Sequence, residues 1–143
     1  MREILFRGKR SGTGEWVKGY YVKHINRTPC PVGDRIRNRD VEHLIFKDGF
    51  SDWNMPRGVE SYQVAPKTVG QYIGIKDKKG TPIFEGDFLF TPDGRYQVVW
   101  NEDWLAFEAK TMVTKEDFSM QELSLDMEVI GNIYDNPELL GEG

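Results

Sequence analysis

The chain has 143 residues, a length that suits one domain or two small ones. Its hydrophobic fraction of 38% includes 13% aromatic residues, enough to build a core, but no apolar run is long enough to cross a bilayer. The single cysteine, Cys30, excludes an internal disulfide framework, and with only His24 and His43 beside it an ordinary zinc site is not expected. No signal-peptide pattern follows the first residues, so we expect a cytoplasmic protein without membrane contact.

The net charge of −4 is unevenly distributed along the chain. Residues 1–66 hold 12 Lys and Arg against 8 Asp and Glu, a balance of +4, whereas residues 67–143 hold 7 against 15, a balance of −8. The asymmetry fits a basic face for an anionic partner, or two halves that attract each other within a chain or between subunits. We favour the second interpretation, because nucleic-acid-binding domains are usually far more basic.

Residues 4–22 predict a first antiparallel hairpin. Gly12 and Gly14 mark its tip, where glycine supplies the positive φ that a tight turn needs. The second arm, residues 16–22, is rich in aromatic and β-branched side chains, which is typical of a strand. No Lys-Ser/Thr pair and no helix start follow the glycines, so a phosphate-binding loop is excluded there.

Residues 24–60 give weaker signals. Prolines and a glycine indicate a loop over residues 28–34. After it, Arg35, Arg37 and Arg39 alternate, so on a strand their side chains would share one face. Such a stripe could track phosphates, but we expect a solvated loop because runs of charge are usually solvated.

Residues 43–46 predict a short strand that ends at an Asp-Gly turn signal. Beyond it, Phe50, Trp53 and Met55 lie among polar and turn-forming residues. They fit a loop pinned to the core or an exposed partner-binding patch, and we expect the pinned loop. A further strand is predicted at residues 62–64.

Residues 68–87 carry the clearest pattern: a strand, a tight turn, a second strand and a second turn. Short strands at 88–90, 95–101 and 104–109 follow it, and short turns force such neighbours to pair antiparallel. We then expect a helical turn at 116–120, a last strand at 127–134 and a helical turn begun by Asn136 and Pro137. The turn residues to which we assign a structural role are Gly74, Gly80, Glu85, Gly86 and Asp87.

The predicted fold class is therefore mostly β. Short consecutive strands in the C-terminal half favour a small SH3-like barrel, because closing a sheet removes its unpaired edges. The alternative is a flat antiparallel sheet covered by the N-terminal half. We expect an N-terminal β-hairpin arm or subdomain with irregular loops over residues 1–66, followed by the barrel over residues 67–143.

Several stretches form a pattern that spans the chain. They are REILFRGK at 2–9, GEWVKG at 14–19, the hairpin at 68–87, VVW at 98–100 and EVIGNIYDNPELL at 128–140. The pattern resembles the YopX family of phage- and prophage-encoded proteins. The chain departs from that family at 65–67, where an acidic pair usually surrounds the proline, and at Ile73, where Thr is usual. The resemblance implies an SH3-like barrel and a phage or prophage origin in a bacterial host cell, but no activity, and no role carries over for the acidic pair.

Glu85 and Asp87 come closest to a catalytic carboxylate pair, which would need a raised pKa or a bound metal. In a Glu-Gly-Asp turn, however, the aspartate usually caps backbone amides. Cys30 lacks a matched base and is a poor nucleophile candidate. Trp100 and Trp104 could stack on a base or a peptide, but their alternation favours core packing. We therefore assign no catalytic, cofactor-binding or metal-binding residue.

The sequence favours a non-enzymatic protein that forms a homo-oligomer or binds a phage or host protein. The charge asymmetry and the aromatic fraction motivate this expectation. The alternative is an accessory protein that binds nucleic acid, and a hydrolase that uses Glu85 and Asp87 is a third, disfavoured hypothesis. The candidate nucleic-acid contacts are Arg7, Lys9, Arg10, Arg35, Arg37 and Arg39.

Overall fold

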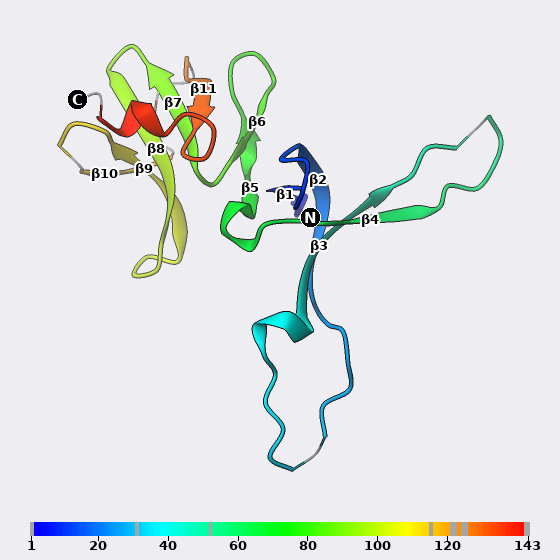
Figure 1. The fold of residues 1–143 in the computed structure, drawn as a ribbon. Helices are drawn as coiled ribbons and strands as arrows, with labels where there is room; N and C mark the ends of the chain where they lie inside the picture. Colours follow the sequence, from blue (N-terminus) through cyan, green and yellow to red (C-terminus); the bar gives the residue numbers. More distant parts are fainter. Residues whose placement is uncertain are drawn as a thin grey trace. The chain divides into compact units, whose positions relative to one another are not determined.

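The computed structural model describes residues 2–30, 32–51, 53–114, 116–120, 123 and 126–141. In this part of the chain the ordered elements are β-strands and short 3-10 helices (Figure 1), which confirms the prediction of a mostly β protein. The chain divides into a first unit, Ile4–Val69, and a second unit that joins Met1–Glu3 to Gly70–Gly143.

The first unit is an antiparallel meander with the spatial order β4-β3-β2-β1. Each strand pairs with the next one along the chain, so every connection is a hairpin. The elements are β1 (Phe6–Lys9), β2 (Trp16–Ile25), η1 (Asn38–Asp40), β3 (Val41–Asp48), β4 (Val59–Gln63) and η2 (Pro66–Thr68).

A small core holds these strands together. Its buried residues are Val17, Ile45 and Val64, against which Phe6, Tyr21, Tyr62 and Val69 pack. Close approach of β2 to β3 depends on Gly19, because an added Cβ there would lie 2.9 Å from the carbonyl carbon of Phe46. The core thus forms where the strands overlap and reaches only part of β2, whose residues 22–25 are all exposed.

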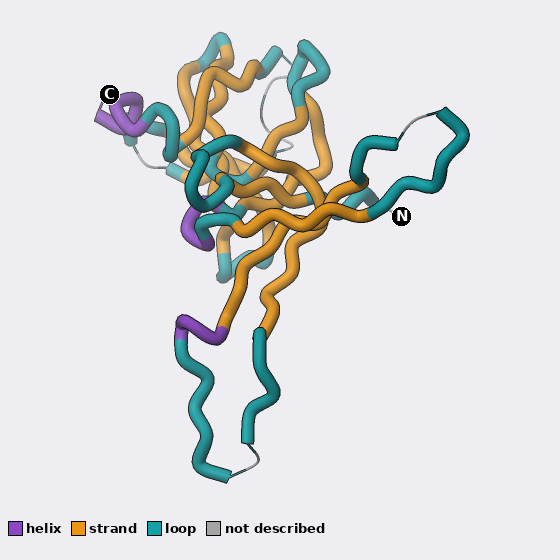
Figure 2. Tube along the Cα trace, turned by 45° about the vertical axis from the view of Figure 1, so that its right-hand side comes forward, coloured by secondary structure: helices purple, strands orange, loops and turns teal. Residues whose placement is uncertain are grey.

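Beyond this core, the two hairpins that share β3 extend away from the sheet as arms (Figures 1 and 2). Residues 26–40 connect β2 to β3, and we call them the arginine loop. Residues 49–58 connect β3 to β4, and we call them the aromatic arm. A hydrogen bond from the Gly49 amide to the Gly58 carbonyl oxygen, 2.8 Å long, closes the base of the aromatic arm.

The second unit contains a five-stranded antiparallel sheet in the order β10-β9-β8-β7-β11, together with the hairpin β5–β6. Its elements are β5 (Gly70–Lys76), β6 (Pro82–Phe84), β7 (Asp87–Thr91), β8 (Gly94–Asn101), β9 (Ala106–Thr111), β10 (Asp117–Ser119), β11 (Glu128–Asn132) and η3 (Pro137–Gly141). The buried core joins the hairpin to the sheet through Ile83, Leu89, Tyr96, Val98, Ala109 and Met127.

The expected SH3-like barrel does not close. In the described part of the chain, β10 pairs only with β9 and β11 pairs only with β7, so both ends of the five-stranded sheet stay open. The strand at one end, β10, has three residues, and the register of β11 shifts between Val129 and Gly131. Antiparallel pairing of successive strands follows the prediction, whereas closure of the sheet does not.

The helical turn expected at residues 116–120 is also wrong, because β10 occupies this segment. Phe118 opposes Ala109 of β9 in the ladder, and its ring meets Tyr96 edge-on with centroids 5.9 Å apart. Strand pairing and this aromatic contact outweigh a weak local helix preference.

Candidate functional site

Asp77 fixes the turn of the central hairpin through backbone amides. One carboxylate oxygen accepts hydrogen bonds from the amides of Lys79 (2.9 Å) and Thr81 (2.8 Å), and the other accepts the amide of Val129 (3.0 Å). Burial acts to raise the pKa of this carboxyl, but the three amide bonds outweigh it and the pKa lies below its usual value. The hairpin is thereby tied to β11, and Gly80 completes the turn at φ 84°.

The Glu85-Gly86-Asp87 turn likewise uses its aspartate for geometry. Asp87 is 1% exposed, and its carboxylate accepts the Phe84 amide at 2.8 Å. Gly86 has φ 91°, and its amide donates to the Val98 carbonyl oxygen at 2.9 Å. Glu85 is half-buried, and burial raises the pKa of its carboxyl. The raised pKa meets one requirement of a catalytic pair, but Asp87 is closed to solvent and holds a backbone amide.

Gly74, the last of the predicted turn residues, also adopts a positive φ. Gly74 has φ 97° and lies inside β5, where the pairing with β6 shifts register between Tyr72 and Lys76. A glycine there allows the irregularity that a residue with a Cβ would resist.

The first three candidate nucleic-acid contacts lie on or beside β1 and pack on aromatic rings. The guanidinium carbon of Arg7 is 4.6 Å from the ring centroid of Trp16, and the Lys9 ammonium is 5.4 Å from the same centroid. Arg10 lies 4.5 Å from the Tyr62 centroid. Arg7 is only 8% exposed. These cations stabilise the sheet by cation–π contact, which makes them poor candidates for a phosphate site.

The other three candidates lie far from β1 within the same unit. Arg7 pairs with Lys18 on β2, whereas the arginine loop begins at Asn26. At the rise of a strand this separation is about 25 Å. The six cations therefore do not form one patch, and Arg35, Arg37 and Arg39 must be judged separately.

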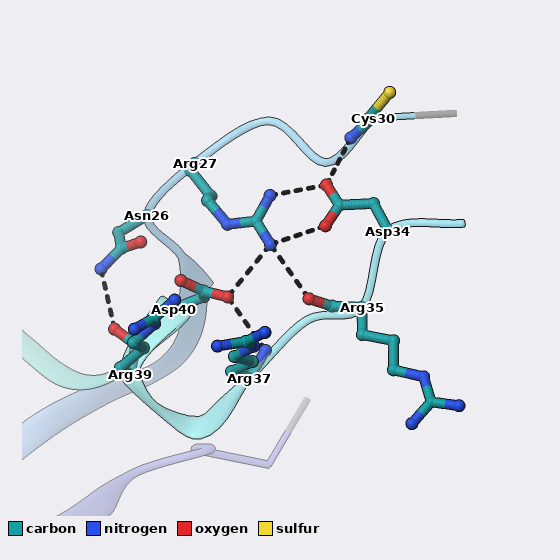
Figure 3. A network of polar contacts seen from close by, with 8 residues as sticks. All are labelled: Asn26, Arg27, Cys30, Asp34, Arg35, Arg37, Arg39 and Asp40. Carbon is teal, nitrogen blue, oxygen red and sulfur yellow. Dashed lines mark hydrogen bonds and ion pairs between the residues drawn. The ribbon is translucent and has the colours of Figure 1, made fainter. Parts of the chain in front are cut away.

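Arg27 organises the arginine loop (Figure 3). Its guanidinium donates two parallel hydrogen bonds to the Asp34 carboxylate, at 2.7 and 3.0 Å, and a third to the Arg35 carbonyl oxygen at 3.0 Å. The same group lies 3.2 Å from the Asp40 carboxylate. A bidentate guanidinium–carboxylate pair has a fixed geometry, so these contacts hold the two sides of the loop together.

Backbone amides complete the frame. The Cys30 amide donates to Asp34 at 2.6 Å, and the Arg37 amide donates to Asp40 at 2.9 Å. Hydrogen bonds from Arg27 and then from the Cys30 amide lower the pKa of Asp34 to about 2. The Arg37 amide and Arg27 also lower the pKa of Asp40. Both acids are therefore ionised at neutral pH and already have donors.

The three remaining arginines of the loop take part in the hydrogen bonds described for this frame through backbone atoms. Arg35, Arg37 and Arg39 are exposed, and none forms an ion pair with a described residue. Figure 3 shows the Arg35 side chain extending away from the network. The segment is an exposed loop, as expected, and not a strand with its arginines on one face, since Arg39 lies in η1. All three line a hollow of about 300 Å³ together with Arg27, Gly33 and Asp34.

The aromatic arm is exposed and is not pinned to the core. Phe50 is 90% and Trp53 is 97% exposed, and Met55 is also exposed. Asn54 adopts φ 67°, a left-handed conformation that asparagine tolerates in turns. The expectation of a pinned loop is therefore wrong, and the structure supports the other interpretation, an exposed apolar patch.

The sequence also drew attention to the pair Trp100 and Trp104 and to Cys30. Trp100 packs edge-on against Phe107 with centroids 4.9 Å apart, and Trp104 in the following turn is 76% exposed, so the expected packing of both rings in the core is wrong. Cys30 is an exposed free thiol in the arginine loop. No group of three or more His, Cys, Asp or Glu side chains among the described residues is placed to hold a metal ion.

Sequence reasoning missed Arg27, Asp34 and Asp40 as a group. A partial signal was present, because Asp40 follows Arg37 by three residues, the spacing at which an aspartate can accept an amide at a helix start. Nothing in the sequence shows that Arg27 reaches across the loop to both acids. The frame depends on how the loop closes, and closure depends on the pairing of β2 with β3.

Comparison with known proteins identifies one family. The family model described as YopX protein matches residues 6–141. A search of curated proteins gives no match. Among the helices of the described residues, none has the length and hydropathy required to cross a membrane. A match over nearly the whole chain shows that this protein belongs to the YopX family.

Proposed function

We propose that this protein is a non-enzymatic, phage- or prophage-encoded binding protein that associates with a second copy of itself through the aromatic arm. The observation that carries the proposal is the exposure of Phe50 and Trp53 at 90% and 97% on a hairpin loop that extends beyond the core. Large apolar side chains held in water are a common mark of an interaction surface.

The energetic argument favours a macromolecular partner. Burying a side chain as large as phenylalanine yields about 1.5–3 kcal/mol, and tryptophan is enriched among residues that dominate interface energies. Met55 on the same arm adds a flexible side chain that adapts to a partner surface. An arm closed at its base by the Gly49–Gly58 hydrogen bond presents these groups with limited loss of entropy.

The charge distribution favours a second copy as the partner. Residues 4–69, the first unit, hold 12 Lys and Arg against 7 Asp and Glu, a net charge of +5. Because the whole chain has a net charge of −4, the residues of the second unit have a net charge of −9. The first unit of one molecule and the second unit of another attract each other. Association of this kind should weaken as salt rises, because salt screens exposed charges.

Sedimentation velocity over a range of concentrations at low and high salt tests the proposal. We expect the wild type to associate at micromolar concentration and Trp53→Ser to sediment as a monomer. The matched control is Trp104→Ser, which removes an exposed tryptophan from the second unit and should associate like the wild type. A wild type that is monomeric in both salts would refute self-association. Association that persists in Trp53→Ser would refute the role of the arm.

The setting in a bacterial cytoplasm is also part of the proposal. The family resemblance supports the phage or prophage origin, and the exposed free thiol of Cys30 suits a reducing compartment. Fractionation of the host after phage induction tests this, and recovery of the protein from the periplasm or the membrane would contradict it.

A further inference from the structure

We propose that the arginine loop and the adjoining end of the β2–β3 ribbon bind the phosphate backbone of duplex DNA. This inference goes beyond self-association, and it rests on residues of the first unit other than those of the aromatic arm. It narrows the six cations that the sequence suggested to Arg35, Arg37 and Arg39 and adds Lys23 on the ribbon.

The frame of the loop leaves these arginines available. The Arg27 guanidinium donates two hydrogen bonds to the Asp34 carboxylate and lies 3.2 Å from the Asp40 carboxylate. The acids that could neutralise the neighbouring arginines are therefore already committed to Arg27 and to backbone amides. Four arginines against two aspartates give residues 26–40 a balance of +2.

The hollow at the loop has the chemistry of a phosphate site. Each described lining residue other than Gly33 is charged, and the cationic residues among them are Arg27, Arg35, Arg37 and Arg39. Guanidinium groups match phosphate oxygens with paired, charge-assisted hydrogen bonds. A volume of about 300 Å³ leaves room for a phosphodiester to enter without disturbing the Arg27–Asp34 pair.

The positive surface continues along the ribbon. Arg39 also lines a second hollow of about 560 Å³, whose other lining residues include Lys23, Asn26, Asn38 and His43. Glu42 is the acid among its described lining residues. Lys23 pairs with His43 in the ladder between β2 and β3, so the cations extend from the loop onto the strands.

The form of this region favours a duplex. Residues 22–25 of β2 are all exposed. Next to the loop, His24 and Ile25 pair with Glu42 and Val41, which lie beyond the β3–β4 ladder, so this end of the hairpin is a two-stranded ribbon. The major groove of DNA admits a two-stranded β-ribbon, and cations beside such a ribbon reach the flanking phosphates. Aromatic side chains, on which single strands usually stack, are absent from residues 26–40.

Fluorescence anisotropy with a labelled DNA duplex and the matching single strand, at increasing salt, tests the inference. We expect the wild type to bind the duplex at low salt and to bind the single strand more weakly. The variant Arg35→Gln/Arg37→Gln/Arg39→Gln should bind the duplex at least about 10-fold more weakly. The fall of the logarithm of its DNA association constant with the logarithm of the salt concentration should be shallower, by about 3 in slope, because each phosphate contact contributes about 0.9.

The matched control is Lys18→Gln/Lys47→Gln/Lys67→Gln, which removes the same charge from exposed positions of the first unit outside the loop. It should keep the affinity and the salt slope close to those of the wild type. The inference is overturned if the wild type does not bind the duplex at low salt, or if both triple variants lose affinity equally. Tighter binding of the single strand would overturn the assignment to a duplex. The oligomeric state of the loop variant, measured in parallel, should equal that of the wild type, so that this test is separate from the test of self-association.

Discussion

The two units use aspartate in different ways. In the second unit, Asp77 and Asp87 are buried, and the hydrogen bonds described for them come from backbone amides that fix turns. In the arginine loop, Asp34 and Asp40 hold a guanidinium group as well as amides, and the loop carries exposed charge. Carboxylates thus build the geometry of a core in one unit and the frame of an exposed, arginine-rich loop in the other.

The substitution Asp87→Ala gives the largest expected effect and tests whether a buried aspartate stabilises the second unit. It leaves the Phe84 amide without its buried acceptor, which costs about 1–3 kcal/mol and lowers Tm by about 4–8 °C per kcal/mol in a unit of this size. Urea denaturation measures the loss, and Asp93→Ala, at an exposed turn position, is the control with a change below about 0.5 kcal/mol. Equal stability of the two variants would show that Asp87 does not hold the turn.

Asp77 should make the stability of the fold depend on pH in the acidic range. Its pKa is lowered in the folded protein, so its contribution to stability is present above the unfolded value near 3.9 and is lost as the pH falls below it. The wild type should therefore lose more stability than Asp77→Asn between pH 5 and pH 2. Thermal unfolding across this range is the measurement, and parallel pH profiles for the two proteins would contradict the prediction.

Arg27 tests the frame of the arginine loop. In the folded protein the pKa of Asp34 is about 2, and removal of the guanidinium by Arg27→Gln should raise it towards the ordinary value near 3.9. Carboxyl chemical shifts followed by NMR report this pKa directly. Tm should change little, because the loop lies outside the core. An Asp34 pKa that is the same in both proteins would mean that Arg27 does not hold this acid.

Glu85 gives the smallest expected effect, with the opposite sign. Burial raises its pKa, so its charge opposes folding at neutral pH, and this loss of stability disappears as the pH falls below the unfolded value near 4.3. We expect Glu85→Gln to raise Tm at pH 7 by less than about 4 °C, the shift that about 1 kcal/mol would give. At pH 3.5 the two proteins should unfold together, and a Tm that falls at pH 7 would contradict the assignment.

Local chemistry in the sequence was enough to predict the hairpins and turns. Gly80 and Gly86 adopt positive φ, and the Asp87 carboxylate accepts an amide within its own turn, as a Glu-Gly-Asp sequence suggests. These features depend on residues two to four positions apart, where the preferences of glycine and aspartate act directly.

Features that depend on distant segments could not be predicted. Whether the second sheet closes is decided by β10 and β11, whose edges find no partner among the described strands. Phe50 and Trp53 have the same sequence context whether their loop folds back or extends, so their exposure was missed. The Arg27 frame joins residues 7 to 13 positions apart through the closure of a loop.

The most direct test of the account is the oligomeric state of Trp53→Ser compared with its thermal stability. If the aromatic arm binds a second copy and takes no part in the fold, the variant should sediment as a monomer at concentrations where the wild type associates, while the Tm extrapolated to low concentration is equal for both. A wild type that does not associate would contradict the account. A variant whose Tm falls at low concentration would also contradict it, since Trp53 would then be part of the folded core.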